Sequence, residues 1–236
     1  MKKFFENAPV TRKLKMSELI QRDYRYLLTI DRFNIPLGFK DKTIEEVCAL
    51  NDVDLNTFLL VANMLENPAS GEGFPVQEIK IPLIIQVLKK THSHFLDYRL
   101  PKLREDLGKM IINADEVHKT LLLDFFDQYE KEVRRHMRYE EKYVYPYVVS
   151  LFSNGQIDGH DIEYYERQHN DIERKINDLR NIIIKYLPPL GDVNQVNDLL
   201  YMLFQSEEDL NRHTFIEENI LFPAVKWMES KRKNNG

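Results

Sequence analysis

Two histidines in this sequence are each followed four residues later by a glutamate, and the residues around them repeat as well. The first copy reads His136-Met-Arg-Tyr-Glu140-Glu-Lys-Tyr-Val-Tyr-Pro146, and the second reads His213-Thr-Phe-Ile-Glu217-Glu-Asn-Ile-Leu-Phe-Pro223. Residues four apart on an α-helix lie on the same face, about one turn from each other. Each copy therefore directs an imidazole and a carboxylate the same way, which is a metal-binding arrangement if that face points into the protein.

The spacing between the copies extends the pattern to two more histidines. Residues 136 and 213 are 77 positions apart, and the same offset relates His92 to His169. The other three histidines, His94, His118 and His160, show no such pairing. The candidate metal ligands are His92, His136, Glu140, His169, His213 and Glu217.

Four imidazoles and two carboxylates suit iron, manganese or zinc better than magnesium or calcium. Six ligands are more than one tetrahedral zinc ion uses. The symmetry of the repeat predicts two metal ions, each bound by two histidines, with both carboxylates bridging them. One added bridging oxygen, oxo or hydroxo, would give each metal about five donors and leave room for a small ligand such as O2 or NO.

A single His-x-x-x-Glu pair would be weak evidence for a metal site. The chain has 38 acidic residues among 236, so such a pair often arises by chance on a solvated helix face. Two copies that share the second glutamate and the proline, each with a partner histidine earlier in the chain, favour metal binding. His94 is the alternative to His92 as ligand and lies on a different side of the predicted helix; the 77-residue offset favours His92.

Neighbours of the ligands allow two further interpretations. Glu141 and Glu218 follow the candidate glutamates by about 100° of helix rotation, so we expect them to face solvent or to support the ligands from outside. Tyr143, Tyr145 and Tyr147 form an aromatic run that we expect to serve packing rather than redox chemistry.

The elements that must position these residues are all predicted to be helical. Only eight glycines occur, and long stretches carry apolar residues with a period near 3.6. The last four of these helices are joined by short connections, so we expect them to pack as an up-down-up-down four-helix bundle with metal between facing helices. Pro101, Pro146 and Pro223 fall inside them and should bend or interrupt the helix. The predicted helices cover residues 16–33, 43–50, 54–66, 78–110, 113–152, 159–187 and 193–230.

The chain is predicted to contain two domains. Residues 1–66 form a small N-terminal helical domain, residues 67–77 a polar linker rich in turn formers, and residues 78–236 the bundle. Thr43-Ile-Glu-Glu46 is a capping-box pattern, and Asn113 is a candidate cap for the second bundle helix.

Composition narrows the class of protein. A net charge of −5 and a pI near 5.9 provide no electrostatic basis for binding nucleic acid or an anionic membrane. No stretch approaches 18 consecutive apolar residues, and the start of the chain does not have the pattern of a signal peptide. The single cysteine, Cys48, excludes an internal disulfide framework and suits a reducing compartment. We therefore expect a cytoplasmic protein; its oligomeric state is open, a homodimer being one option.

The two His-x-x-x-Glu-Glu stretches, each ending in an aromatic residue and proline, together with His92 and His169, resemble the hemerythrin-like fold. More narrowly they resemble the di-iron proteins called repair of iron centres. His92-Ser-His-Phe-Leu-Asp-Tyr-Arg-Leu-Pro-Lys-Leu103 is similar to that family's run of histidine, aromatic and Leu-Pro-x-Leu, although one residue longer. The resemblance implies two iron ions and a role in stress response, in which the protein repairs damaged iron–sulfur proteins or supplies them with iron, with NO as a further ligand.

The N-terminal part departs from that family. In the family, the N-terminal turn carries a Cys-Cys-Gly signature. This chain instead reads Asn34-Ile-Pro-Leu-Gly38 and has only the glycine of that signature. No thiol is left there to act as a nucleophile or redox partner. This departure favours a second hypothesis, an O2- or NO-binding sensor or carrier. No catalytic residue is identified, and whether the chain has enzymatic turnover stays open.

Overall fold

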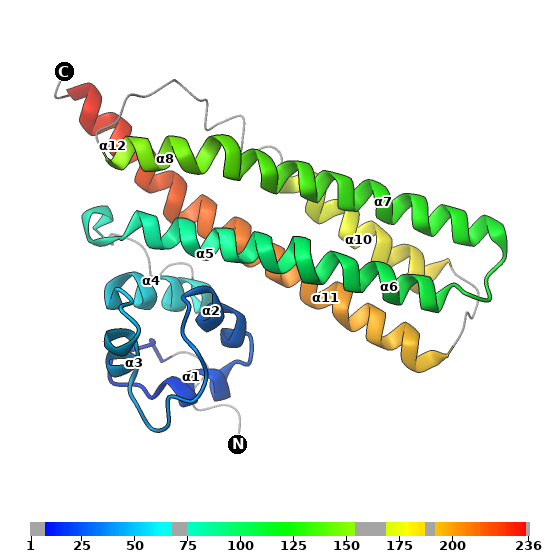
Figure 1. Cartoon of the computed structure of the whole chain (residues 1–236), viewed down its shortest axis with the longest axis horizontal. Helices are drawn as coiled ribbons and strands as arrows, with labels where there is room; N and C mark the ends of the chain where they lie inside the picture. The colour runs from blue at the N-terminus through cyan, green and yellow to red at the C-terminus, as the bar shows by residue number, and fades with distance from the viewer. Residues whose placement is uncertain (1–7, 68–74, 154–168, 187–191, 235–236) are drawn as a thin grey trace. The chain divides into compact units, whose positions relative to one another are not determined.

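The computed structural model describes residues 8–67, 75–153, 169–186 and 192–234. Regular structure in these ranges is helical, and no strand occurs among them, so the predicted all-α class is confirmed (Figure 1). The first helices are α1 (Met16–Arg22), α2 (Tyr26–Arg32), α3 (Ile44–Leu50), α4 (Leu55–Glu66) and the short η2 (Val76–Glu78). The later ones are α5 (Ile81–His94), η3 (Phe95–Arg99), α6 (Leu100–Met110), α7 (Glu116–Tyr139), η4 (Glu140–Val144), α8 (Tyr145–Phe152), α10 (His169–Lys185), α11 (Val193–Ile216), η5 (Glu217–Leu221) and α12 (Phe222–Asn234).

The single helix predicted over residues 16–33 is wrong, because the chain breaks between α1 and α2. Asp23 adopts an extended conformation, with φ −150° and ψ 111°. Its carboxylate accepts a hydrogen bond from the backbone N–H of Arg25 at 2.9 Å and another from the Arg25 Nε at 2.8 Å. Such a local side-chain bond offers the backbone an alternative to the helical ladder. Apolar periodicity reflects only which residues are buried, so it does not reveal this competing hydrogen bond.

Helix starts follow local capping chemistry. Thr43 and Glu46 form the predicted capping box, with the Thr43 side chain accepting from the Glu46 N–H and the Glu46 carboxylate accepting from the Thr43 N–H. The predicted cap Asn113 is wrong, because α7 begins two residues later with Asp115 as its N-cap. The Asp115 carboxylate accepts from the N–H of His118 and also contacts its imidazole. His118 is therefore part of a helix cap.

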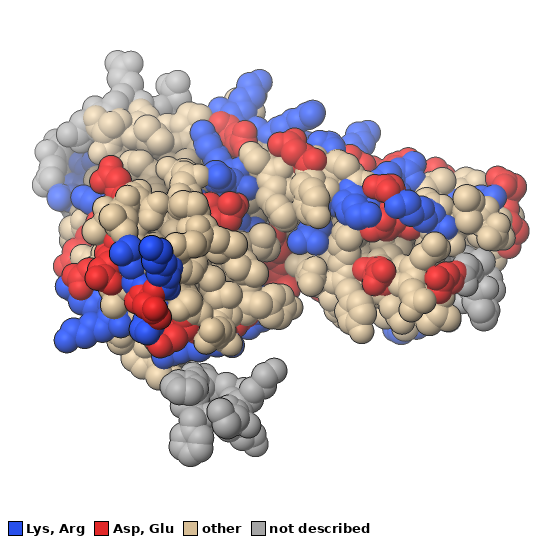
Figure 2. Space-filling view, turned by 60° about the horizontal axis from the view of Figure 1, so that its bottom comes forward, with Lys and Arg blue, Asp and Glu red and all other residues tan. Residues whose placement is uncertain are grey.

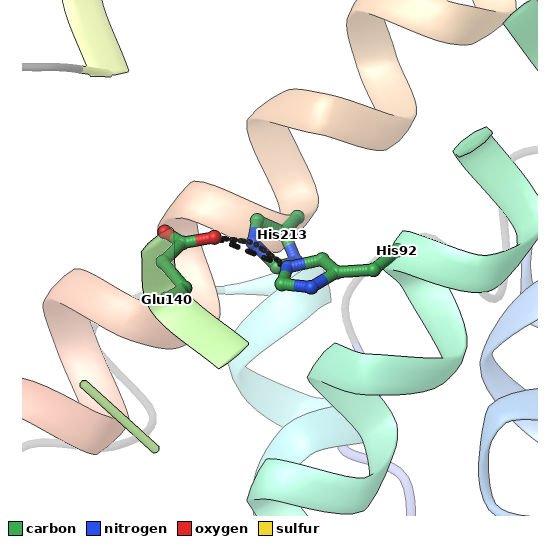
Figure 3. A group of neighbouring side chains, drawn as sticks. All are labelled: His92, Glu140 and His213. Carbon is green, nitrogen blue, oxygen red and sulfur yellow. Dashed lines mark hydrogen bonds and ion pairs between the residues drawn. The ribbon is translucent and has the colours of Figure 1, made fainter. Parts of the chain in front are cut away.

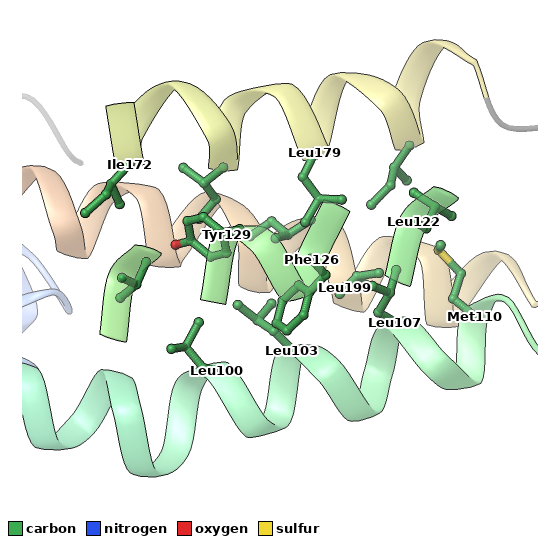
Figure 4. Close-up of a cluster of buried hydrophobic side chains, with 14 of the residues drawn as sticks. Leu100, Leu103, Leu107, Met110, Leu122, Phe126, Tyr129, Ile172, Leu179 and Leu199 are labelled. Atoms are coloured by element: carbon green, nitrogen blue, oxygen red, sulfur yellow. The ribbon is translucent and has the colours of Figure 1, made fainter. Parts of the chain in front are cut away.

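Four helices form the bundle that the sequence predicts. Helix α6 packs against α7 and α11, and α10 also packs against α7 and α11, so each helix touches the two that neighbour it in a closed ring. Their inward faces supply a continuous apolar core that includes Leu103, Phe126 and Leu179 (Figure 4). Burial of this core provides the main driving force for assembling the bundle.

Each of the three prolines within the bundle helices follows a π turn. The segments η3, η4 and η5 are π-helical, and Pro101, Pro146 and Pro223 are each the second residue of the α-helix that follows. Proline lacks the N–H that an α-helix needs and clashes with the preceding turn, so a wider turn accommodates it. The predicted interruption is confirmed, and it takes the form of an inserted residue rather than a broken helix.

The chain divides into two compact units, one made of residues 1–90 with 223–236 and the other of residues 91–222. Within the first unit, the Tyr26 hydroxyl donates to the carbonyl of Ala62 at 2.8 Å, and the rings of Phe33 and Phe58 meet edge to face. The predicted linker over residues 67–77 lies largely outside the described residues, so the boundary there stays a prediction.

The described part of the chain shows no membrane-spanning feature, since none of its helices is both long and apolar enough to cross a bilayer. On the face shown in Figure 2, basic and acidic side chains are intermixed.

Candidate metal centre

Five of the six candidate ligands come together in the second unit. They form two overlapping groups, and within each group one donor atom per residue lies within 4.8 Å of the others. All five side chains are almost completely buried. The first group is His92, Glu140 and His213, and the second is His136, Glu140 and Glu217.

Glu140 is the residue that the two groups share. Its Oε1 lies 2.9 Å from Nε2 of His136. Its Oε2 lies 3.2 Å from Nε2 of His92, and Figure 3 shows these two side chains together with His213. The same Oε2 is 3.9 Å from Nε2 of His213, which in turn is 3.4 Å from Oε2 of Glu217. One carboxylate thus presents an oxygen to each group, as a bridging ligand would.

The helices explain why these side chains converge. His136 and Glu140 lie one turn apart on α7 and the start of η4, and His213 and Glu217 repeat this arrangement on α11 and η5. His92 lies near the end of α5, three residues before η3 begins. Three separate helical segments therefore each direct a ligand, or a pair of ligands, into one buried space.

His92 also contacts an acidic residue on its outer side. Its Nδ1 lies 2.9 Å from Oε1 of Glu141, whose side chain is 44% exposed. Sequence reasoning left Glu141 to face solvent or to support a ligand, and it does both. Burial lowers the pKa of His92, but its hydrogen bonds with Glu140 and Glu141 outweigh this effect and raise the pKa from 6.5 to about 9. In the metal-free protein this imidazole is therefore protonated at neutral pH.

Tyr145 is the site residue that sequence reasoning missed. Its hydroxyl donates to Oε1 of Glu217 at 3.0 Å and lies 3.2 Å from Nε2 of His92. Burial, together with the nearby carboxylates of Glu217 and Glu140, raises the pKa of the phenol well above its ordinary value, so it stays protonated. The sequence contained one signal for this position: the 77-residue repeat places an aromatic residue there in both copies, Tyr145 in the first and Phe222 in the second.

Two other predicted residues have different outcomes. His169 is the first residue of α10, a helix that packs against α7 and α11, but its side chain lies outside the described residues. His94 belongs to neither ligand group, and its ring lies 5.4 Å from that of Tyr98. The arrangement favours His92 over His94, as the repeat does.

A small cavity adjoins the ligands. Its volume is about 10 Å³, which holds roughly one water-sized molecule. Apart from the two histidines and one threonine, its walls are apolar. It is lined by Val133, His136, Met137, Ile172, Leu210, His213 and Thr214.

The donor set fits a metal centre chemically. Glu140 and Glu217 are each only 1% exposed, and burying two carboxylates in one place is costly unless cations compensate them. Imidazole nitrogens and carboxylate oxygens in combination suit iron, manganese or zinc. These residues could therefore hold such ions, whose positive charge would stabilise the two buried carboxylates.

Comparisons with known proteins point the same way. Residues 83–225 match the family model described as the hemerythrin HHE cation binding domain. The chain is also similar to the iron-sulfur cluster repair protein ScdA of Staphylococcus haemolyticus (strain JCSC1435), at 22% identity over 184 residues, which covers 76% of this chain and 82% of that protein.

Proposed function

Since this chain belongs to the hemerythrin HHE cation-binding family, we propose that it holds two iron ions and acts as an iron–sulfur cluster repair protein. In this role it supplies iron to damaged iron–sulfur proteins, or repairs them, under oxidative or nitrosative stress. The observation that carries the proposal is the buried pair of ligand groups joined by Glu140.

The internal repeat supports two metal positions rather than one. A shift of 77 residues forward takes His92 to His169, and the same shift backward takes His213 to His136. The pair His92 and His213 in the first group therefore corresponds to the pair His169 and His136. We propose that His169 completes the second group, so that each iron has two histidines and both glutamates lie between the ions.

Bound iron would supply one-electron redox chemistry and reversible binding of small ligands. The protein's own residues do the rest. His92, with Glu141 behind it, presents Nε2 to the centre, and Glu140 spans the two positions. The apolar bundle core excludes bulk water from the ligands, which strengthens their electrostatic interactions with a cation.

The repair role rests on the named relative and must proceed without thiol chemistry in the first unit. The single cysteine, Cys48, is buried in α3, and burial raises the pKa of its thiol to about 12. In the turn where the family carries its cysteine pair, the retained Gly38 adopts φ +103°, a conformation that L side chains rarely take. The glycine is kept here for its backbone conformation, which needs no cysteine.

A second candidate function is a sensor or carrier of O2 or NO, and the small cavity favours it. The cavity touches His136 and His213, each from a different ligand group, and has space for a molecule of about the size of water. In this second hypothesis, O2 or NO binds at this space next to the ligands. In this hypothesis the first unit relays the state of the centre to a partner.

The metal centre is tested by removing one ligand from each copy of the repeat. His136→Ala and Glu217→Ala should each lower the iron content below two per chain and lower the melting temperature, because metal that binds only the folded state stabilises it. His118→Ala, on the same helix as His136, is the matched control for iron content. Two irons retained by both ligand variants would show that the assigned centre is wrong.

Repair and sensing are separated by a reconstitution experiment. The reduced, iron-loaded protein is mixed with an iron–sulfur enzyme that NO has inactivated, and recovered activity is followed with His136→Ala as the control. Recovery that depends on the loaded centre supports repair. Absence of recovery, combined with reversible spectral changes on adding O2 or NO, would reject repair in favour of the sensor.

A further inference from the structure

Tyr145 lies among the proposed ligands rather than in the apolar core. Its hydroxyl donates to Oε1 of Glu217 at 3.0 Å and lies 3.2 Å from Nε2 of His92. Its ring stacks against the His92 ring, with a centroid distance of 5.5 Å and an interplanar angle of 23°. The side chain is completely buried. A buried hydroxyl in direct contact with two ligand residues is in a position to affect how they bind a metal.

The π turn η4 is what brings Tyr145 to this place. The N–H of Tyr145 donates to the carbonyl oxygen of Glu140, five residues earlier. In a regular α-helix, residues five apart are rotated by about 140° from each other, so Tyr145 would point away from the ligand face. A π turn, with its i to i+5 hydrogen bond, places them on nearly the same face.

The second copy of the repeat provides an internal comparison. Phe222 occupies the position of Tyr145, 77 residues later, and its N–H donates to the carbonyl oxygen of Glu217 across η5. The backbone geometry is therefore repeated, but phenylalanine has no hydroxyl. Glu217 receives a hydrogen bond from residue 145, and Glu140 receives no counterpart from residue 222.

We propose that Tyr145 is a positioning residue of the metal centre, whose hydroxyl orients the Glu217 carboxylate and makes the two halves of the centre unequal. This inference rests on the proposed di-iron function. A partner outside the ligand sphere fixes the orientation of a ligand. A hydrogen bond that a ligand accepts also withdraws electron density from it, so the ligand supports the ferric state less strongly.

The test compares Tyr145→Phe with Tyr129→Phe in the full-length, iron-loaded protein. Tyr129 is completely buried in the same bundle, and its hydroxyl has no hydrogen-bond partner among the described residues. Both substitutions remove one oxygen atom and keep the ring, so both variants should fold, as circular dichroism would verify. Three quantities are measured: iron per chain, the rate at which a chelator removes ferrous iron, and the reduction potential.

We expect all three proteins to bind two irons. Tyr145→Phe should lose ferrous iron about tenfold faster than wild type, the scale typical for removing a partner of a metal ligand. Its reduction potential should be lower, because Glu217 then donates more strongly to the ferric ion. Tyr129→Phe should match wild type in both measurements. A change of packing alone would not shift the potential of one variant and leave the other unchanged.

Two results would overturn the inference. Unchanged release rate and potential in Tyr145→Phe would show that the hydroxyl does not act on the centre. An intense phenolate-to-iron absorption band in the ferric wild type, absent from Tyr145→Phe, would show that Tyr145 binds iron directly instead of through Glu217. Failure of the wild type to bind two irons would contradict the proposed function itself, and iron analysis separates that outcome from the others.

Discussion

The Nδ1 atom of His92 lies 2.9 Å from Oε1 of Glu141, the residue that directly follows the shared ligand Glu140. A carboxylate only accepts hydrogen bonds, so Nδ1 donates to Glu141, and Nε2 is the nitrogen that would bind a metal once it has lost its proton. The same contact fixes the orientation of the ring. In the first copy of the repeat the doubled glutamate thus has two roles, with Glu140 directed toward the centre and Glu141 toward a histidine of another helix.

The repeat extends this relationship to a pair whose histidine side chain lies outside the described residues. Glu218 corresponds to Glu141, and His169 corresponds to His92. We predict that Glu141→Ala and Glu218→Ala each weaken iron binding roughly tenfold, as loss of such outer partners usually does. Competition with a chelator measures the affinity, and Glu116→Ala, at an exposed position on α7, is the control. A normal affinity in Glu218→Ala alone would disprove the proposed contact with His169.

Replacing neighbouring histidines should distinguish a ligand from its neighbour. His92→Ala should remove most of the visible absorption of the iron centre, because His92 Nε2 faces both Glu140 and His213. His94→Ala should leave most of it, because His94 belongs to neither ligand group. Absorption spectra and iron content of the two purified variants provide the measurement. The reverse pattern would move the ligand by two residues and break the symmetry of the repeat.

Filling the small cavity should block small ligands without removing the metal. Ile172→Phe adds volume at the cavity wall, and overpacking of this kind costs about 1–3 kcal/mol in the free energy of unfolding. We expect two irons per chain and slower, weaker binding of O2 or NO, followed by stopped-flow absorption.

The control for that variant is Leu203→Phe, which overpacks the same core on α11. Ten residues separate Leu203 from His213, about 15 Å along the helix. Equal ligand binding in the two variants would show that the cavity is not the ligand site.

The metal-free protein should lose stability as the pH rises. The pKa of His92 is raised from an ordinary 6.5 to about 9 in the folded state. The stability gained from its protonation is fully present below pH 6.5 and is lost as the pH rises through 9. Iron needs the neutral imidazole, so its affinity should increase over the same interval. Melting temperatures and iron affinities across this range measure both trends, and a metal-free protein that is more stable at pH 9 than at pH 6.5 would contradict the prediction.

Local sequence patterns were sufficient to predict much of the fold and of the candidate metal centre. The all-α class, the four-helix bundle and the capping box at Thr43 follow from apolar periodicity and from interactions between residues three or four apart. The same holds for the pairs His136 with Glu140 and His213 with Glu217, because a helix places residues four apart on one face. The 77-residue repeat then selected His92 over His94, a choice that agrees with the ligand groups.

Tertiary structure decided the features that depend on residues far apart in the sequence or on a change of helix type. The Tyr145 hydroxyl reaches Glu217 across 72 positions and His92 across 53. Regular α-helical spacing directs Tyr145 away from the ligands, and only the π turn returns it to their face. The sharing of Glu140 between two groups likewise requires three helical segments packed at one depth in the bundle, which no local pattern encodes.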